Sequence, residues 1–165
     1  MSKRKQCAVC EKALAACICQ QITVIDSDIE LIILQHPTEV KNAIGTARIL
    51  NLSLPQCQII IGEDFTANGQ LNEILNDPQR ECYLLYPGDD SVSVEELGSA
   101  TLTKQLKRTF ILLDGTWRKA FKMYQSSVNL HAIAAVKLNA ENVSKYTIRQ
   151  TSIEGGLSTV EAGCL

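Results

Sequence analysis

Long apolar runs are missing from the sequence: no stretch of its 165 residues has the length and hydrophobicity that crossing a bilayer requires. The basic start, Met1 to Gln6, has no apolar h-region behind it and so lacks the pattern of a secretory signal. Internal repeats and low-complexity tracts are also absent, which argues against a repeat architecture. With 45% hydrophobic and 21% charged residues, the length fits one globular domain, and we expect a cytoplasmic location.

An excess of positive charge is missing as well, because the net charge is −2. Composition therefore gives no indication of a nucleic-acid partner, and any RNA would have to be held by a local basic face. Groups of Lys and Arg do occur at 3–5, 104–108 and 118–122. They permit RNA binding without demonstrating it.

What the sequence does contain is a series of short apolar runs that alternate with helical patterns. Strands are predicted at 31–34, 58–61, 82–86, 110–113 and 133–138, and helices at 43–52, 71–75, 117–124 and from near Ser158. Several strands are continuously apolar, which is typical of a parallel sheet buried on both faces. The predicted class is α/β, a mostly parallel sheet flanked by helices, with ligands bound beyond the carboxyl ends of the strands.

The last residues carry a helix-start signal. Ser158 and Glu161 have the spacing of a capping box, yet only four residues follow. A helix of about one turn is not stable alone. Either this helix docks through other contacts or the natural protein is longer.

Four of the seven cysteines crowd into the first twenty residues, in the spacing C-x2-C-x6-C-x-C: Cys7, Cys10, Cys17 and Cys19. A cytoplasmic chain rarely uses such cysteines as a disulfide framework, whereas four thiolates are a typical zinc ligand set. We predict a structural zinc site; free thiols in a loose tail and an iron–sulfur cluster are the alternatives. Cys57 and Cys82 are expected to be small buried hydrophobic residues.

The segment from Phe110 to Ala120 is the most informative part of the sequence. An apolar strand ends in Asp114, Gly115 permits a sharp turn, and a helix begins with Trp117, the only tryptophan. Asp114 would then face a ligand site, and the helix start would offer N–H groups to an anion. The alternative is an ordinary Asp-Gly turn with Thr116 as the N-cap.

The two histidines of the sequence differ in position. His36 follows a strand, which is a position typical of a site, although a turn role is favoured. His131 is interpreted as structural.

In these features the chain resembles the DTW-domain family of tRNA-uridine aminocarboxypropyltransferases, relatives of the SPOUT RNA methyltransferases. The resemblance covers nearly the whole chain. The matching motifs are the cysteine pattern, 36–39 with 45–50 (HPTE and GTARIL), 84–87 (LLYP), 114–117 (DGTW), 146–149 (YTIR) and 157–162 (LSTVEA).

The resemblance implies S-adenosylmethionine as the donor and N3 of a tRNA uridine as the acceptor, with acp3U and methylthioadenosine as products. It also implies a zinc-binding segment over 1–20 and a SPOUT-like catalytic domain over 21–165, in a monomer or homodimer. Family members usually continue past the LSTVEA helix. Whether the chain includes the C-terminal trefoil knot of the SPOUT relatives therefore stays open.

The resemblance also assigns residues, with Asp114 as the catalytic residue, either as the base for N3 or as a ligand of the donor. Donor-binding residues are expected at Thr46, Leu85, Tyr86, Pro87, Leu113, Gly115, Thr116, Trp117, Leu157, Ser158 and Thr159. Trp117 could instead fill the core. RNA contacts are offered by Arg118, Lys119 and Arg149, for which a solvated surface role is the alternative.

Two rival functions remain at this point. A SPOUT-type methyltransferase would use the same donor and leave a methyl group on the RNA. A non-catalytic, zinc-bearing RNA-binding module would bind no donor at all.

Overall fold

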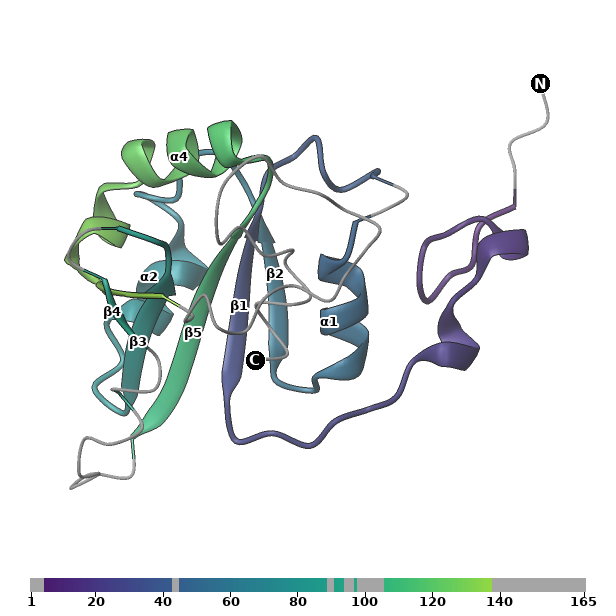
Figure 1. Cartoon of the computed structure of the whole chain (residues 1–165), viewed down its shortest axis with the longest axis horizontal. Coiled ribbons are helices and arrows are strands. Elements are labelled where there is room, and N and C mark those ends of the chain that lie inside the picture. Colours follow the sequence, from purple (N-terminus) through teal and green to yellow (C-terminus); the bar gives the residue numbers. More distant parts are fainter. Residues whose placement is uncertain (1–4, 43–44, 89–90, 94–96, 98–105, 138–165) are drawn as a thin grey trace.

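The computed structural model describes residues 5–42, 45–88, 91–93, 97 and 106–137. Within them, six strands form one sheet in the order β2-β1-β5-β3-β6-β4, and every pairing between neighbours is parallel (Figure 1). The strands are β1 (Glu30–Gln35), β2 (Cys57–Ile61), β3 (Arg80–Leu85), β4 (Val92–Ser93), β5 (Lys107–Asp114) and β6 (Ala134–Lys137). The predicted α/β class with a mostly parallel sheet is confirmed.

Helices cover both faces of this sheet. They are α1 (Ala47–Ser53), α2 (Gly69–Leu75) and α4 (Trp117–Ser126), with 3-10 turns at Leu14–Ala16, Cys19–Gln21 and Val128–Ala132. In Figure 1, α1 lies on the opposite side of β1 and β5 from α2 and α4. Among the described residues, none of the helices has the length and hydropathy that crossing a bilayer requires.

The core divides into two clusters because neighbouring residues of a strand point to opposite faces. On one face, Ile32 and Leu34 of β1 pack with side chains of α2 and α4, such as Leu71 and Met123. On the other face, β1 and β5 pack against α1, as Ile33 and Leu112 do with Ala47 and Leu50. All six residues of β1 are buried, which explains why its four central residues, 31–34, are all apolar rather than alternating.

A buried carboxylate joins the amino ends of three strands. Glu30 of β1 accepts hydrogen bonds from Thr109 Oγ1 (2.9 Å) and Lys107 Nζ (3.1 Å) of β5 and from the guanidinium of Arg80 in β3. Burial alone would raise the pKa of Glu30, but these donors outweigh it and hold the pKa below its ordinary value. This cluster lies at the sheet edge opposite the expected ligand site.

The structure corrects several predicted boundaries. The helix expected over 43–52 begins at Ala47: residues 43 and 44 lie outside the described part of the chain, and Gly45 and Thr46 precede the helix. The two-residue strand β4 was not predicted. The other strands and the two later helices agree with prediction to within three residues at each end. The predicted helix near Ser158 lies outside the described residues.

Candidate functional site

The crevice between β1 and β5 is where an open α/β sheet is expected to bind its ligand. The chain leaves the carboxyl end of β1 toward α1 on one face, and leaves the neighbouring β5 toward α4 on the other. Strands whose connections diverge in this way open a crevice at their carboxyl ends. The two residues that end these strands, Gln35 and Asp114, lie directly opposite each other in the register.

Gln35 and Asp114 form the centre of the candidate site. Gln35 Nε2 donates a hydrogen bond of 2.8 Å to Asp114 Oδ2, and each residue is only 7% exposed. Both share strand parity with residues of the cluster under α1, so their side chains project on the α1 face. A carboxylate in this position has a fixed direction at the edge where substrates are expected.

His36 links the carboxyl ends of β1 and β5 beside this pair. Its backbone N–H donates to the Asp114 carbonyl (3.0 Å), its Nδ1 lies 2.9 Å from Thr38 Oγ1, and its Nε2 lies 3.5 Å from Glu63 Oε1. The imidazole is buried. The turn role that the sequence favoured for His36 is therefore observed, directly beside Asp114.

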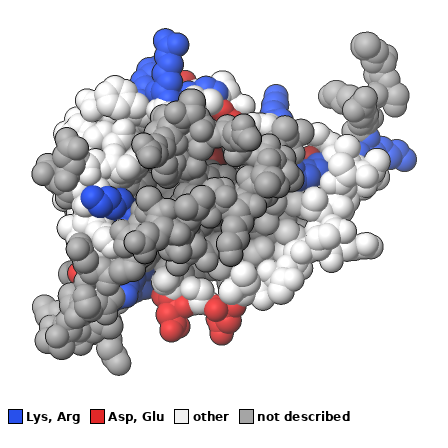
Figure 2. Space-filling model, in the orientation of Figure 1, with Lys and Arg blue, Asp and Glu red and all other residues white. Residues whose placement is uncertain are grey.

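Two lysines of α4 bind the loops that follow β1 and β2. Lys119 Nζ lies 2.7 Å from Glu39 Oε1 and 2.7 Å from Thr38 Oγ1, and Lys122 Nζ lies 2.9 Å from Glu63 Oε2. Lys122 holds the pKa of Glu63 below its ordinary value. Figure 2 shows Lys and Arg side chains over the position of α4 with acidic side chains beside them. Lys119, predicted to contact RNA, is thus engaged within the chain, whereas Arg118 is exposed.

The Asp-Gly-Thr-Trp turn brings α4 close to β1. A Cβ at Gly115 would lie 3.1 Å from Lys119 Cβ and 3.7 Å from His36 Cβ, so a side chain here would be crowded unless α4 shifted. Thr116 is the N-cap of α4, with its Oγ1 accepting from Lys119 N, and Trp117 is the first helical residue. The predicted N-cap is confirmed. In the same turn, Asp114 is buried at the end of β5.

The predicted donor-binding residues in the described part divide between the two faces. Leu85 packs with the cluster under α1, on the face of Asp114, and Thr46 directly precedes α1. Leu113 and Tyr86 pack with the opposite cluster, where the Tyr86 ring stacks on Tyr124 with centroids 4.6 Å apart. Pro87 is exposed. Four further predicted residues, Arg149, Leu157, Ser158 and Thr159, lie outside the described residues.

Thr46 is buried, and its Oγ1 has no hydrogen-bond partner among the described residues. A buried hydroxyl without a partner loses the hydrogen bonds that water would give it. Its position before α1 places it at the carboxyl edge of the sheet.

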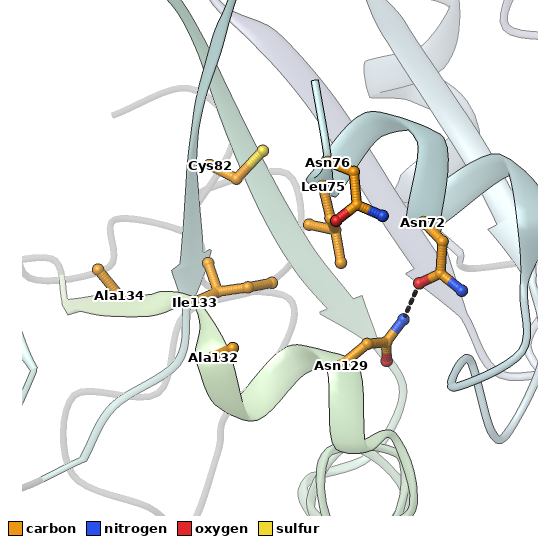
Figure 3. Close-up of a pocket in the computed structure, with 8 residues that line it drawn as sticks. All are labelled: Asn72, Leu75, Asn76, Cys82, Asn129, Ala132, Ile133 and Ala134. Atoms are coloured by element: carbon orange, nitrogen blue, oxygen red, sulfur yellow. Dashed lines mark hydrogen bonds between the residues drawn. The ribbon is translucent and has the colours of Figure 1, made fainter. Parts of the chain in front are cut away.

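A cavity of about 380 Å³ lies elsewhere, beside the first half of β3 (Figure 3). It is lined by Asn72, Leu75, Asn76, Cys82, Asn129, Ala132, Ile133 and Ala134. Its amides bond to one another, as Asn129 Nδ2 does to Asn72 Oδ1 at 2.7 Å. None of the predicted site residues contributes to it.

The four N-terminal cysteines meet at one point. Their sulfur atoms all lie within 4.8 Å of one another, with Cys7 and Cys19 at 3.6 Å and Cys10 and Cys17 at 3.8 Å. Zinc–thiolate bonds of about 2.3 Å in a tetrahedron require sulfur atoms about 3.8 Å apart. The thiols present therefore fit a zinc ion.

Hydrogen bonds within this cluster give its thiols different pKa values. Backbone donors at Ile18 and Lys12 lower the pKa of Cys10 to about 6, whereas the hydrogen bond with Cys17 and burial raise the pKa of Cys19 to about 12. Of the two cysteines expected in the core, Cys57 is buried and Cys82 is half-buried. Burial raises the pKa of Cys57 to about 11, as expected for an unreactive thiol.

Sequence reasoning missed two residues of the candidate site, Gln35 and Glu63. Each comes at the end of an apolar run, Gln35 after 31–34 and Glu63 two residues after β2. A polar residue that directly follows a buried parallel strand was the signal available. The partner of Gln35 is Asp114, which lies 79 positions away in the sequence. This pairing could be known only from the order of the strands.

Comparisons with known proteins identify the family of the chain. The DTW-domain family model matches residues 4–165. The chain is 36% identical over 173 aligned residues to tRNA-uridine aminocarboxypropyltransferase 2 of Drosophila melanogaster, covering 99% of this chain and 66% of the relative. It is 27% identical to the mouse (Mus musculus) protein of that name, covering 99% and 55%, and 26% identical to tRNA-uridine aminocarboxypropyltransferase A of Arabidopsis thaliana, covering 82% and 56%.

The chain thus spans between about half and two thirds of the length of these relatives. No solved structure matches it. The family model covers almost every residue, including those of the crevice and of the cysteine cluster. The chain belongs to the DTW-domain family.

Proposed function

We propose that the chain transfers the 3-amino-3-carboxypropyl group of S-adenosylmethionine to N3 of a uridine in tRNA, in the cytoplasm. The names of its relatives support this reaction class. The observation that carries the proposal is the buried Gln35–Asp114 pair at the crevice between β1 and β5. It provides an oriented carboxylate at the sheet edge where a donor and a base would meet.

The reaction forms a C–N bond, breaks a C–S bond and transfers the N3 proton of uridine to a base. N3 of uridine loses its proton and attacks the methylene carbon that joins the amino acid chain to the sulfonium. The new C–N bond forms as the C–S bond breaks, and the electron pair of that bond returns to sulfur. Methylthioadenosine leaves as a neutral thioether, and acp3U remains in the RNA.

Selection of this carbon over the methyl carbon must come from the pose of the donor, because both are attached to the same sulfonium. The site has to bring the methylene carbon within near-attack distance of N3 and keep the methyl group away from it. Donor contacts are proposed for Thr46, Leu85, Tyr86, Pro87, Leu113, Gly115, Thr116, Trp117, Leu157, Ser158 and Thr159.

Asp114 has two proposed roles in this site. As a base it would take the N3 proton, and as a donor ligand it would bind the ammonium group of the amino acid chain. Gln35 is a positioning residue in either case, since its amide N–H fixes the direction of the carboxylate. The α1 face, on which Asp114 and Leu85 lie, is the favoured side for the donor.

A structural zinc ion is proposed for Cys7, Cys10, Cys17 and Cys19, on the fit of their sulfur positions. Zinc held by four thiolates keeps a local fold together and takes no part in the transfer. RNA contacts are proposed for Arg118, Lys119 and Arg149. For Lys119, a phosphate would have to replace Glu39.

The test is mass spectrometry of tRNA nucleosides after incubation with the protein and S-adenosylmethionine. We expect acp3U in the RNA and methylthioadenosine in solution. A methylated nucleoside with S-adenosylhomocysteine would establish the rival methyltransferase. Absence of donor binding by calorimetry would establish the non-catalytic RNA-binding module.

Asp114→Asn keeps the size of the side chain and removes its charge. We expect at least a hundredfold lower transfer rate, in the range of general acid–base contributions. Asp26→Asn, at an exposed carboxylate of the N-terminal half, should leave the rate within twofold. A lower kcat at saturating donor supports the base role, and a raised KM for S-adenosylmethionine supports the donor role. Parental transfer by Asp114→Asn would refute both.

A further inference from the structure

Arg48, the second residue of α1, contacts the cysteine segment (residues 5–21). Its Nη2 donates a 2.6 Å hydrogen bond to the Val9 carbonyl and lies 3.1 Å from Glu11 Oε1. We propose that Arg48 is a positioning residue that couples metal binding in the cysteine segment to the placement of α1. This goes beyond the transfer reaction and does not depend on it.

Both partners of Arg48 belong to the turn that carries the first two thiols. Val9 lies between Cys7 and Cys10, and Glu11 follows Cys10. Backbone hydrogen bonds from Glu11 N to Cys7 O (2.9 Å) and from Cys7 N to Lys12 O (2.8 Å) close this turn. A metal ion that holds Cys7 and Cys10 together would therefore also fix the Val9 carbonyl and the backbone of Glu11, the residues that Arg48 binds.

The conformation of Glu11 indicates that its side chain serves this contact. Its φ is 61°, in the left-handed region that favours glycine and disfavours residues with a Cβ. Glycine would take this place in the turn more easily but would give Arg48 no carboxylate. Because the Glu11 side chain is 62% exposed, its ion pair alone would contribute little, and the charged hydrogen bond to the Val9 carbonyl is the stronger part.

The N-terminal chain holds α1 at its other end as well. Ile25 N donates to the carbonyl of Ser53, the last residue of α1, at 2.8 Å. Figure 1 shows the chain passing α1 on its way from the cysteine segment to β1. A helix of seven residues has little stability of its own, so contacts at both ends decide where it lies.

The start of α1 carries a residue of the candidate site. Thr46 lies two residues before Arg48, and its buried Oγ1 is one of the atoms without a partner in the described part of the chain. Movement of the first turn of α1 would move this hydroxyl. Loss of the metal from the cysteine segment would then change, through Arg48, the position of Thr46 at the carboxyl edge of the sheet.

Hydrogen exchange of the α1 amides in the whole chain tests this coupling, with zinc bound and after removal by a chelator. In the parent protein, we expect zinc to slow exchange at Ile49 and Leu50 about tenfold, the factor that one charge-assisted hydrogen bond provides. In Arg48→Ala the zinc effect should fall below about twofold. Arg118→Ala, at an exposed arginine of α4, is the control and should keep the parental response.

Glu11→Gly separates the contact from the metal site, because glycine fits φ 61° and leaves all four thiols in place. We expect unchanged zinc affinity and a zinc effect on α1 reduced to about threefold, since the Val9 bond remains. This variant and Arg48→Lys keep the test open if Arg48→Ala does not fold. A tenfold zinc effect that persists in folded Arg48 variants, or zinc binding that leaves α1 exchange unchanged in the parent, would overturn the proposal.

A change in KM for S-adenosylmethionine on zinc removal would extend the coupling to Thr46, but it depends on the proposed transfer activity. Hydrogen exchange does not depend on that activity. Failure of the transfer proposal and failure of the coupling can therefore be told apart.

Discussion

At Gly115 the lack of a side chain allows α4 to start next to β1. An added methyl group would have to displace Lys119 Cβ, which would lie only 3.1 Å away, in a turn that also contacts His36. We expect Gly115→Ala to lower the free energy of unfolding by about 1–2 kcal/mol, the cost typical of overpacking. Urea denaturation measures this change.

Gly69→Ala is the matched control for this prediction. Nothing lies within 4 Å of a Cβ at Gly69, the first residue of α2, and alanine favours a helix over glycine. This variant should be neutral or slightly more stable than the parent. Equal losses of stability in both variants would show that space at Gly115 is not the cause.

At the scale of single residues, the sequence predicted the position of Asp114 but not its surroundings. An apolar run ending in Asp-Gly-Thr-Trp is enough to predict a carboxylate at a strand end, and the structure has it there. The partners of that site come from far along the chain, as Glu39 does for Lys119, 80 positions away. Such pairs depend on which strands are neighbours, and hydrophobic periodicity carries no information on that order.

Among the strands, the ion cluster of Glu30 is a contact whose strength depends on pH. Its folded-state pKa lies below the ordinary 4.5, so its stabilisation is present above pH 4.5 and is lost as the pH falls through the lower folded value. We expect Glu30→Gln to lower the free energy of unfolding by about 2–3 kcal/mol at pH 7. Denaturation of parent and variant from pH 7 to pH 3 should show the difference shrinking below pH 4.5.

Glu73→Gln, at an exposed position of α2, provides the comparison and should change stability by less than about 0.5 kcal/mol at every pH. If the difference for Glu30→Gln stayed constant down to pH 3, the ion cluster would not be its source.

The cysteine segment is expected to bind one zinc ion per chain. Cys10→Ser should lose most of this zinc, because it removes the most buried of the four thiols, whereas Cys82→Ala should keep it. Metal analysis of the purified variants, with the thiolate charge-transfer band of the cobalt-substituted protein, measures the outcome. Full zinc content in Cys10→Ser would remove that residue from the ligand set.

Strands and helices were predictable to the degree that burial shaped their sequences. The fully buried β1 contains the unbroken apolar run 31–34 and was placed within one residue at each end. The edge strand β4 has only two residues, with Val92 exposed, and leaves no such pattern. The start of α1 was predicted too early, since Gly45 and Thr46, within the predicted range, precede the helix in the structure.

For the molecule as a whole, the balance of charge around α4 predicts which residue contributes to RNA binding. Lys119 and Lys122 are paired with glutamates, whereas Arg118 is exposed beside the candidate site. We expect Arg118→Ala to weaken tRNA binding about five- to tenfold at low salt and to reduce the salt dependence by about one phosphate contact.

Arg108→Ala is the control for this measurement, because Arg108 lies near the amino end of β5, at the opposite edge of the sheet. Its affinity for tRNA should stay within twofold of the parent in the same filter-binding titrations. Equal weakening by both variants would indicate a diffuse electrostatic effect rather than a contact beside the crevice.

The position of β5 between β1 and β3 has a consequence for biosynthesis. A nascent chain that has emerged only as far as Ser93 has β1 with β2 and, separately, β3, with no hydrogen-bonded seam between them. That seam closes when Lys107–Asp114 leave the ribosome, and the same segment delivers Asp114 opposite Gln35. The two parts of the sheet are therefore joined, and the centre of the crevice is formed, in a single late step, and shorter translation products would expose the apolar flanks of β1 and β3 to chaperones and proteases.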